Sequence, residues 1–235
     1  MKLYLTPLFD EIKKEIKLEE ISLYPDLRDF KAKGVNGEVV LEGEVRHYKA
    51  DKIEKVAFGK YMMKGVEING VSIIPDSNYD LPIFASNLSS TVKGINMDVD
   101  LYPMKDIIIN FDYLEKYISP LQETYDEFLR YSKVNKLDSD FYWSRAIRSP
   151  YWIKGLCPEN ESGPFLDFSK SYLVKWIQFW KEVKPMTNPE EIDILKRRKK
   201  ILRQKISEGD PGKARYFDKI LEDKNIIQRI TDAMI

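Results

Sequence analysis

The region from residue 21 to residue 101 alternates apolar and polar side chains between short connections, and this pattern limits the fold more than any other feature of the chain. The stretch EVVLEGEVRHYKA, residues 38–50, shows the alternation that is typical of a strand with one buried face. Gly59 and the Asn69-Gly70 pair punctuate the region, and Asn-Gly is a strong turn signal. Short connections favour antiparallel pairing, because parallel strands need a long crossover. The sequence therefore predicts a mainly antiparallel sheet.

Further strands and several helices are expected around this region. Three short runs rich in Ile, Val and Phe extend the sheet over residues 81–88, 94–101 and 106–111, and residues 140–155 predict another strand pair. Helices are expected from Thr6-Pro7, over residues 111–133 and 168–183, from Asn188-Pro189 to Gly209, and after residue 217. We therefore expect an α+β fold, an α/β/α sandwich whose central, mainly antiparallel sheet is flanked by helices, as a single domain over residues 1–235.

Composition argues against several functional classes. The chain has 38 basic and 38 acidic residues and no net charge, which argues against a general nucleic-acid binder. Cys157 and His47 are the only residues of their types, so neither an intrachain disulfide nor a Cys/His zinc cluster is expected, and a Ser-His-Asp or Cys-His enzyme would have to use His47. Apolar runs of signal-peptide or membrane-span length are missing, so we expect a cytoplasmic protein without a membrane partner.

A set of motifs between residues 75 and 225 resembles known enzymes. PDSNYDLPIFASN at 75–87 and MDVDLYP at 97–103 resemble the ferredoxin-dependent bilin reductases. YPMKDIIINFDYLEKYISPL at 102–121 is similar to the plant red chlorophyll catabolite reductases, relatives with the same fold. WSRAIRSPYWIKG at 143–155 resembles a serine-plus-arginine strand of both groups, and ARYFDKILEDKN at 214–225 resembles the start of their C-terminal helix.

This resemblance implies an enzyme without a bound redox cofactor. Its substrate would be a linear tetrapyrrole, a biliverdin-like bilin or a related catabolite, held between the sheet and the C-terminal helices. Reduced ferredoxin would supply single electrons, and the protein would supply protons. Such chemistry needs an acid held near a pyrrole ring and a basic residue for the propionates. The resemblance leaves open a non-catalytic tetrapyrrole-binding protein, or a relative whose ligand is not a tetrapyrrole.

The residues that would donate protons follow from the same resemblance. The family's central proton-donating Asp aligns with Asn87, whose amide has no proton to give at neutral pH, although it can hydrogen-bond a ring carbonyl or nitrogen. A histidine found in some members aligns near Gly70 and is missing. The second acid of the family, on its C-terminal helix, aligns nearest Asn225, and a small gap in the alignment would place Asp223 there instead. Asp218 matches the more N-terminal Asp of the same motif. Without the resemblance, Asn87 would be read as an ordinary edge-strand or turn residue, and Asp218, Asp223 and Asn225 as residues on a solvated helix face.

The candidate substrate-binding residues are Arg148, Ser144, Ser149 and Asp51. Arg148 lies on an apolar-rich strand segment, where a lone charge needs a partner. The resemblance implies that its guanidinium donates two hydrogen bonds to a propionate. Ser144 and Ser149 share this segment, and Ser149 could donate to the same carboxylate. Asp51 aligns loosely with an acidic position of one family branch. The alternative for Arg148 is an internal ion pair with a carboxylate such as Asp100.

One run of basic residues is the strongest charge cluster of the chain: Lys196, Arg197, Arg198, Lys199 and Lys200. By itself such a run is usually a solvated helix face. With the resemblance, it offers a landing surface for acidic ferredoxin, because opposite potentials raise encounter rates. A nucleic-acid partner is less favoured, because the surrounding segment lacks an aromatic stacking platform.

Overall fold

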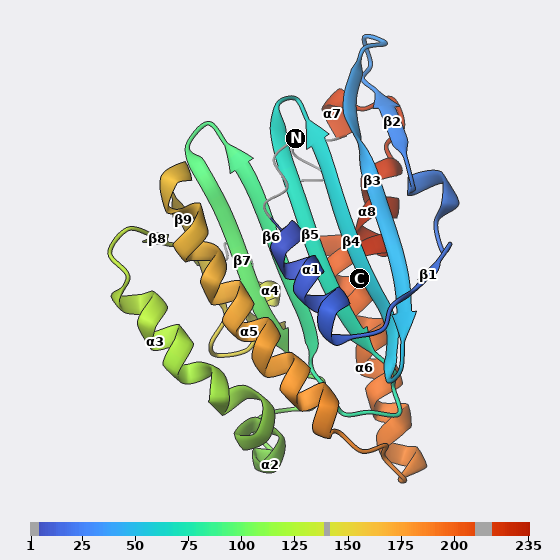
Figure 1. Cartoon of the computed structure of the whole chain (residues 1–235). Helices are drawn as coiled ribbons and strands as arrows, with labels where there is room; N and C mark the ends of the chain where they lie inside the picture. Colours follow the sequence, from blue (N-terminus) through green and yellow to red (C-terminus); the bar gives the residue numbers. More distant parts are fainter. Residues whose placement is uncertain (1–4, 139–141, 210–217) are drawn as a thin grey trace.

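A nine-stranded sheet forms the middle of the protein (Figure 1). The structure is a computed structural model that describes residues 5–138, 142–209 and 218–235, without the side chains of residues 142, 208, 209 and 218. Its strands run in the order β1-β3-β4-β5-β6-β7-β9-β8, and β2 also pairs with β3. The strand bounds are β1 Glu19–Ile21, β2 Phe30–Lys33, β3 Val39–Ala50, β4 Ile53–Met63, β5 Val66–Pro75, β6 Ile83–Thr91, β7 Gly94–Tyr102, β8 Asn135–Lys136 and β9 Ile153–Cys157. Every pairing between these strands is antiparallel, as the sequence predicted.

Helices cover both faces of the sheet and give three layers (Figure 1). The face towards the viewer carries α1 (Thr6–Glu15), α3 (Gln122–Arg130) and α5 (Ser162–Glu182), whereas α6 (Pro189–Gly209) and α8 (Ile226–Met234) lie behind it. The shorter helices are α2 (Phe111–Tyr113), α4 (Tyr142–Ile147) and α7 (Asp218–Ile220). The expected α+β sandwich is confirmed. Within the described ranges, no helix is both long enough and apolar enough to span a bilayer.

The long helix α6 begins and ends where its sequence signals predict. The side-chain oxygen of Asn188 accepts the backbone N–H of Glu190 at 2.9 Å, which satisfies one of the free donors of the first turn. Glu190 and Glu191 add negative charge at the positive end of the helix dipole. Residues of this helix form one wall of the site described below.

Two hydrophobic cores hold the layers together. On the side of α1 and α5, alternate residues of the central strands are fully buried against Trp176, whose ring N–H donates to the carbonyl of Pro82 at 2.8 Å. On the other side, a smaller core joins Leu41 and Val45 of β3 to Ile227 and Ile230 of α8. Burial of apolar surface at about 25 cal/mol per Å² makes both cores stabilising. The smaller core anchors α8 over β3 and leaves the surface of β5 and β6 partly uncovered.

Two predicted strands have a different structure. Residues 106–110 form a turn, and Phe111 begins α2. In the turn, the Asp106 carboxylate accepts the backbone N–H of Ile108 at 2.9 Å, and the Asp106 carbonyl accepts the N–H of Asn110 at 3.0 Å. Such local bonds compete with strand pairing. Of the predicted pair in residues 140–155, only Ile153–Cys157 is a strand within the described residues, because β7 and β8 occupy its two edges, and Tyr142–Ile147 forms the helix α4 instead.

The turn expected at Asn69-Gly70 is also a misassignment. The chain reverses at Lys64-Gly65, where both residues have positive φ, 45° and 80°. Gly70 lies inside β5, directly opposite Gly59 of β4. The glycines therefore serve close packing rather than a turn, and what packs on them belongs to the candidate site.

Candidate active site

A cleft of about 230 Å³ lies between the strands β4–β7 and the helices α6 and α8. Alternate residues of the strands point into it, because successive strand side chains face opposite sides of a sheet. The sheet contributes Tyr61, Ser72, Ile74, Ile83, Ala85, Asn87 and Tyr102, the loop after α4 contributes Arg148, and the helical side contributes Leu202, Arg203, Ile206, Ile230, Thr231, Met234 and Ile235. The cleft is thus mostly apolar with a few polar groups, as ligand sites usually are.

One row of residues, which includes the cleft-lining Asn87, crosses four strands next to the cleft. Gly59, Gly70, Asn87 and Asp98 are successive cross-strand partners on β4, β5, β6 and β7. A Cβ atom added at Gly59 would lie 2.6 Å from Met234 Sδ, and one added at Gly70 would lie 2.8 Å from Met234 Cε. Both contacts are too short, so the two glycines make room for the Met234 side chain. The Met234 side chain fills the space that these glycines leave.

Arg148 extends along the sheet side of the cleft between two aromatic rings. Its guanidinium carbon lies 4.6 Å from the ring centre of Tyr102 and 4.5 Å from that of Trp152, within the range of cation–π attraction. Burial alone would lower the pKa of Arg148, but the neighbouring Tyr102 hydroxyl and the carboxylates of Asp98 and Asp100 outweigh it and raise the pKa above its usual value. The group therefore stays a cation in a site from which most water is excluded.

The hydrogen-bonding capacity of Arg148 is only partly used. Nη1 lies 3.8 Å from Oδ1 of Asp98, an ion pair too long to be a hydrogen bond. Nε and Nη1 are buried and have no hydrogen-bond partner among the described residues. A buried donor without an acceptor costs about 1–3 kcal/mol, more when it is charged. A bound anion would satisfy these atoms.

The loop that carries Arg148 is fixed by Asp100. This carboxylate is fully buried and accepts the backbone N–H of Ser149 at 3.0 Å and its hydroxyl at 2.5 Å. Burial raises the pKa of Asp100 to about 6, against the opposing effects of Arg148 and of the hydrogen bonds from Ser149. Ser149 therefore holds the loop through Asp100, and its hydroxyl is engaged there.

The other residues predicted from the sequence lie away from the cleft. Asp51 is in the turn between β3 and β4, where its carbonyl accepts the ring N–H of Trp180 at 2.9 Å on the α5 side. Ser144 is buried on α4 and does not line the cleft. Asp223 accepts the backbone N–H of Asn225 at 2.8 Å before α8, near β2. The side chain of Asp218 lies outside the described ones. Of the predicted residues whose side chains are described, Asn87 and Arg148 line this cleft.

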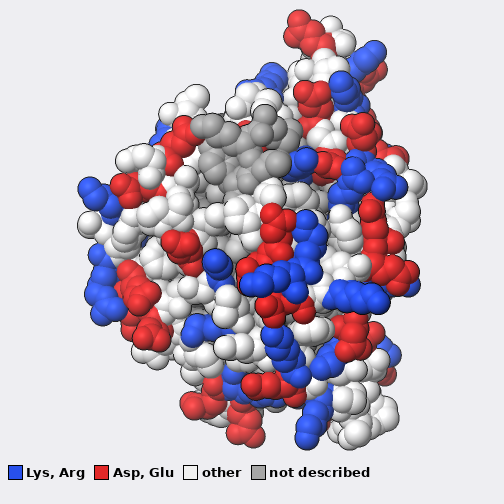
Figure 2. Space-filling view, in the orientation of Figure 1, with Lys and Arg blue, Asp and Glu red and all other residues white. Residues whose placement is uncertain are grey.

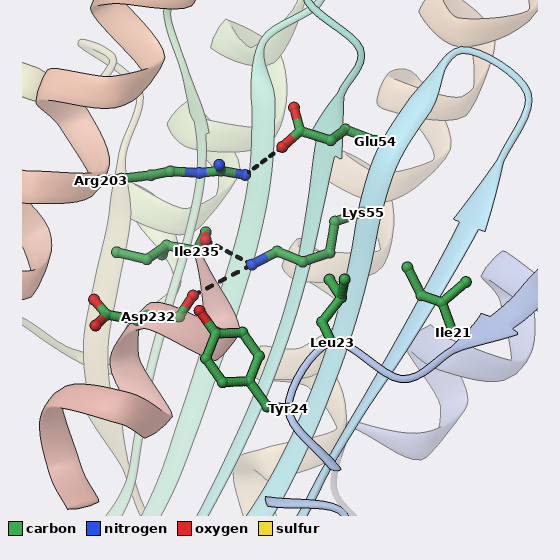
Figure 3. Close-up of a pocket in the computed structure, with 8 residues that line it drawn as sticks. All are labelled: Ile21, Leu23, Tyr24, Glu54, Lys55, Arg203, Asp232 and Ile235. Carbon is green, nitrogen blue, oxygen red and sulfur yellow. Dashed lines mark hydrogen bonds and ion pairs between the residues drawn. The ribbon is translucent and has the colours of Figure 1, made fainter.

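Three buried polar side chains of the sheet hold the last turn of α8. Lys55 Nζ lies 3.0 Å from the carbonyl of Ala233. It also lies 2.6 Å from the carbonyl of Ile235 and 3.4 Å from that of Asp232 (Figure 3). His47 Nε2 lies 3.0 Å from the same Ala233 carbonyl, which requires the tautomer with its proton on Nε2, and Ser72 donates to the carbonyl of Met234. Burial lowers the pKa of Lys55 to about 7. These bonds satisfy carbonyls that a helix end leaves free.

A second cavity of about 500 Å³ adjoins the cleft. Its lining includes Tyr24, Glu54 and Lys55, and it shares Arg203 and Ile235 with the cleft (Figure 3). Arg203 Nη2 donates to Glu54 Oε1 at 2.9 Å, while its buried Nε has no hydrogen-bond partner within the described part of the chain. A second guanidinium thus stands at the boundary of the two cavities.

The sequence reasoning missed Asp98, Arg203 and Met234. The signal for Asp98 was available: β6 and β7 are joined by a two-residue turn, Val92-Lys93, followed by Gly94 with φ 121°. A tight hairpin fixes its register, so this turn alone would have set Asp98 opposite Asn87. The side chains that α6 and α8 contribute have no such local signal.

The chain matches one family of enzymes over most of its length. The family model for ferredoxin-dependent bilin reductases matches residues 6–224, so the chain belongs to the ferredoxin-dependent bilin reductases, a family of oxidoreductases.

Two known proteins are similar to the chain. Phycocyanobilin:ferredoxin oxidoreductase of the bacterium Prochlorococcus marinus is 26% identical over 190 residues, 77% of this chain and 71% of the relative. The crystal structure of phytochromobilin synthase from tomato in complex with biliverdin has the same fold, with a TM-score of 0.80 and 20% identity over 98% of this chain and 83% of that one.

Proposed function

We propose that the protein reduces a biliverdin-like linear tetrapyrrole by coupled single-electron and proton transfers, without a bound redox cofactor. The observation that carries this proposal is the pair of side chains at the floor of one cleft, Asn87 and the partly unsatisfied guanidinium of Arg148. Family membership and the biliverdin in the tomato structure support a bilin as substrate.

The two adjoining cavities together suit such a substrate. Sites for ligands of this size have volumes of about 300–1,000 Å³. The cleft of about 230 Å³ is too small by itself, but the cavity of about 500 Å³ shares Arg203 and Ile235 with it. A bilin would extend across both and displace the Met234 side chain from the two glycines. The Met234 side chain is then the part of the wall that moves.

The two propionates of the substrate would pair with the two arginines. Arg148 offers Nε and Nη1, two buried donors without a hydrogen-bond partner among the described residues, and a guanidinium can bind a carboxylate with two hydrogen bonds. Arg203 offers its Nε at the far side of the cleft, from α6. Asn87 would hydrogen-bond a ring carbonyl or nitrogen and fix which ring lies over the floor.

Ferredoxin would bind on the exposed side of α6. Lys196, Arg197 and Lys200 are exposed there, and a groove of about 440 Å³ between α4 and α6 combines Ile194 and Ile201 with basic residues at its rim. Leu202 lines both this groove and the cleft, so the path for an electron from surface to bilin is short.

One of the five basic residues does not belong to this surface. Lys199 is buried and lies 2.8 Å from Glu54 Oε2 and 2.6 Å from the carbonyl of Pro75, so it joins α6 to the sheet. The opposite face of the molecule, with α1 and α5, mixes blue and red side chains closely (Figure 2) and offers an acidic partner no comparable field.

A direct assay tests the proposal. Purified protein is mixed anaerobically with biliverdin, ferredoxin, ferredoxin reductase and NADPH, and the absorbance of the pigment is followed. We expect a shift to the spectrum of a shorter conjugated system, dependent on ferredoxin. A pigment that stays unchanged, for biliverdin and for other linear tetrapyrroles, contradicts the proposal.

A second candidate is a tetrapyrrole-binding protein without turnover. It is favoured by one observation: no described residue that lines the cleft is an Asp or Glu, the acids Glu54 and Asp232 line only the adjoining cavity, and Asn87 cannot donate a proton in the way an acid does. It predicts tight binding of biliverdin with no reduction in the same assay.

A further inference from the structure

We propose that Asp98 is the acid that delivers protons to the bound bilin. The inference rests on the proposed function, because it assigns a catalytic residue to that reaction. It locates the missing acid one strand away from Asn87, on β7, at a position that the family resemblance of the sequence does not single out.

The geometry that carries the inference is the cross-strand pair of Asn87 and Asp98. The two residues are direct partners of β6 and β7, so their side chains leave the same face of the sheet. Nδ2 of Asn87 donates to Oδ1 of Asp98 at 3.3 Å. The Asp98 side chain is 18% exposed, so water reaches it, and it lies beside two residues that line the cleft, Asn87 and Arg148.

The amide of Asn87 also orients the acid. Because Nδ2 donates to Oδ1, this oxygen acts as an acceptor, and the proton of a neutral carboxyl group sits on Oδ2. Asn87 thus supplies a directed hydrogen bond in place of a proton. The pair performs together what a single acid on β6 would perform by itself.

Arg148 explains how Asp98 becomes protonated when the substrate binds. In the empty cleft, Nη1 of the guanidinium lies 3.8 Å from Oδ1 of Asp98. A propionate bound to Arg148 would share that positive charge between two anions. It also displaces water and brings a negative group close to Asp98. Both changes favour the neutral acid, so bilin binding is coupled to proton uptake.

Other carboxylates near the cleft are engaged elsewhere. Asp100 is fully buried, and both of its oxygens accept hydrogen bonds from Ser149. Asp232 accepts the hydroxyl of Ser207 at 2.5 Å and an N–H of Gln228 at 3.1 Å. Asp98, in contrast, is bonded to a cleft-lining amide and paired with the guanidinium of the cleft.

The step balances with the electron donor already named. Two reduced ferredoxins each give one electron, and two protons are added, so that one double bond of the bilin becomes a single bond and two ferredoxins are oxidised. Asp98 gives the first proton to the one-electron-reduced bilin and becomes a carboxylate. Water reprotonates it through its exposed edge, and it gives the second proton.

The test moves the acid from one strand to the other. Asp98→Asn is compared with wild type and with the double variant Asn87→Asp/Asp98→Asn, and Asp112→Asn, an exposed residue of α2, is the matched control. We expect Asp98→Asn to bind biliverdin within a factor of about three but to lose at least about 100-fold in turnover. A one-electron-reduced bilin radical should accumulate in electron paramagnetic resonance spectra. The double variant should recover most of the turnover with a shifted pH profile, and the control should behave as wild type.

The outcomes separate the two proposals. An active wild type with an equally active Asp98→Asn overturns the role of Asp98 and leaves the bilin reductase function in place. An inactive wild type overturns the function and the acid role with it. If Asp98→Asn does not fold, proton uptake by wild type on biliverdin binding is measured with an indicator dye in weak buffer. Uptake of about one proton supports the inference, and binding without uptake overturns it.

Discussion

The side chain of Ser149 is bound to Asp100 across the gap between the α4–β9 loop and β7, with Oγ 2.5 Å from Oδ1. The backbone N–H of Ser149 donates to the other oxygen, Oδ2. Because Arg148 is the preceding residue, this pair of hydrogen bonds fixes the point from which its side chain extends. The orientation of the guanidinium therefore depends on Asp100, a fully buried carboxylate that does not line the cleft.

Asp100 makes the stability of the protein depend on pH. Burial raises its pKa to about 6 from 3.8, so the folded state holds this proton more tightly than the unfolded state. The resulting stabilisation is fully present below about pH 3.8 and is lost as the pH rises through about 6. We expect the free energy of unfolding of wild type, relative to Asp100→Asn, to increase by about 2 kcal/mol from about pH 7 to about pH 4.5. Urea denaturation at several pH values measures this difference. A difference that stays constant with pH would contradict the assignment.

Replacement of Arg148 tests the anion site. Arg148→Lys keeps the charge but loses the two-pronged geometry, so we expect biliverdin to bind about 10- to 100-fold more weakly. Absorbance titration with biliverdin measures the dissociation constant. Arg145→Lys is the control, because Arg145 is exposed on α4 and pairs with Asp138 at 3.6 Å. Equal affinities of the two variants would show that Arg148 does not hold a propionate.

The contact between Met234 and Gly70 predicts coupled effects on binding. Gly70→Ala places a methyl group where Met234 Cε and Asn87 Oδ1 lie, at 2.8 and 3.0 Å, and should weaken biliverdin binding. Met234→Ala removes the side chain that a bilin has to displace, so it should tighten binding. In the double variant we expect a coupling energy of about 1 kcal/mol, about fivefold in affinity. Purely additive effects in the titrations would argue against a bilin over this pair of glycines.

The basic surface of α6 predicts a defect in the use of ferredoxin. Arg197→Glu and Lys200→Glu should raise the KM for ferredoxin about tenfold at low ionic strength and leave the biliverdin dissociation constant unchanged, because rim charges act mainly on encounter rates. Lys170→Glu, exposed on α5, is the control and should change neither quantity. If Lys170→Glu raised the KM as much, the docking surface would lie on the other face.

Lys199 should behave differently from its neighbours. Its removal leaves the Pro75 carbonyl and the Glu54 carboxylate without their buried cation. We expect Lys199→Met to lower the free energy of unfolding by about 1–3 kcal/mol, and its effect on the KM for ferredoxin to be small. Thermal or urea denaturation next to the ferredoxin titration separates these effects. If Lys199→Met had normal stability and a raised KM for ferredoxin, Lys199 would belong to the docking surface.

Local signals explain which parts of the fold could be predicted. The antiparallel sheet followed from alternation and short connections, and α6 followed from Asn188-Pro189 at its start and Gly209 at its end. The prediction was wrong where long-range context decided the outcome. Residues 142–147 have strand-like aromatic content but find both edges of β9 occupied, and Gly70 looked like a turn residue although Met234, far along the chain, requires its lack of a side chain.

The candidate site could be predicted only in part for the same reason. Asn87 and Arg148 stand in recognisable motifs, and both line the cleft. Arg203 and Met234 reach it from helices whose placement follows from tertiary packing rather than from a motif. Asp223 and Asn225 resemble the family motif in sequence, but they precede α8 near β2 and do not line the cleft.

The position of Met234 on two facing glycines gives the cleft a built-in spectroscopic probe. Its methyl group lies where the conjugated rings of a pigment would stack, and the chain has only seven methionines. In protein labelled with ¹³C at methionine methyl groups, one resonance should shift strongly through the ring currents of any aromatic ligand that occupies this floor. Occupancy of the cleft can thus be followed by nuclear magnetic resonance with colourless compounds, which makes the site accessible to ligand screening independently of any enzymatic assay.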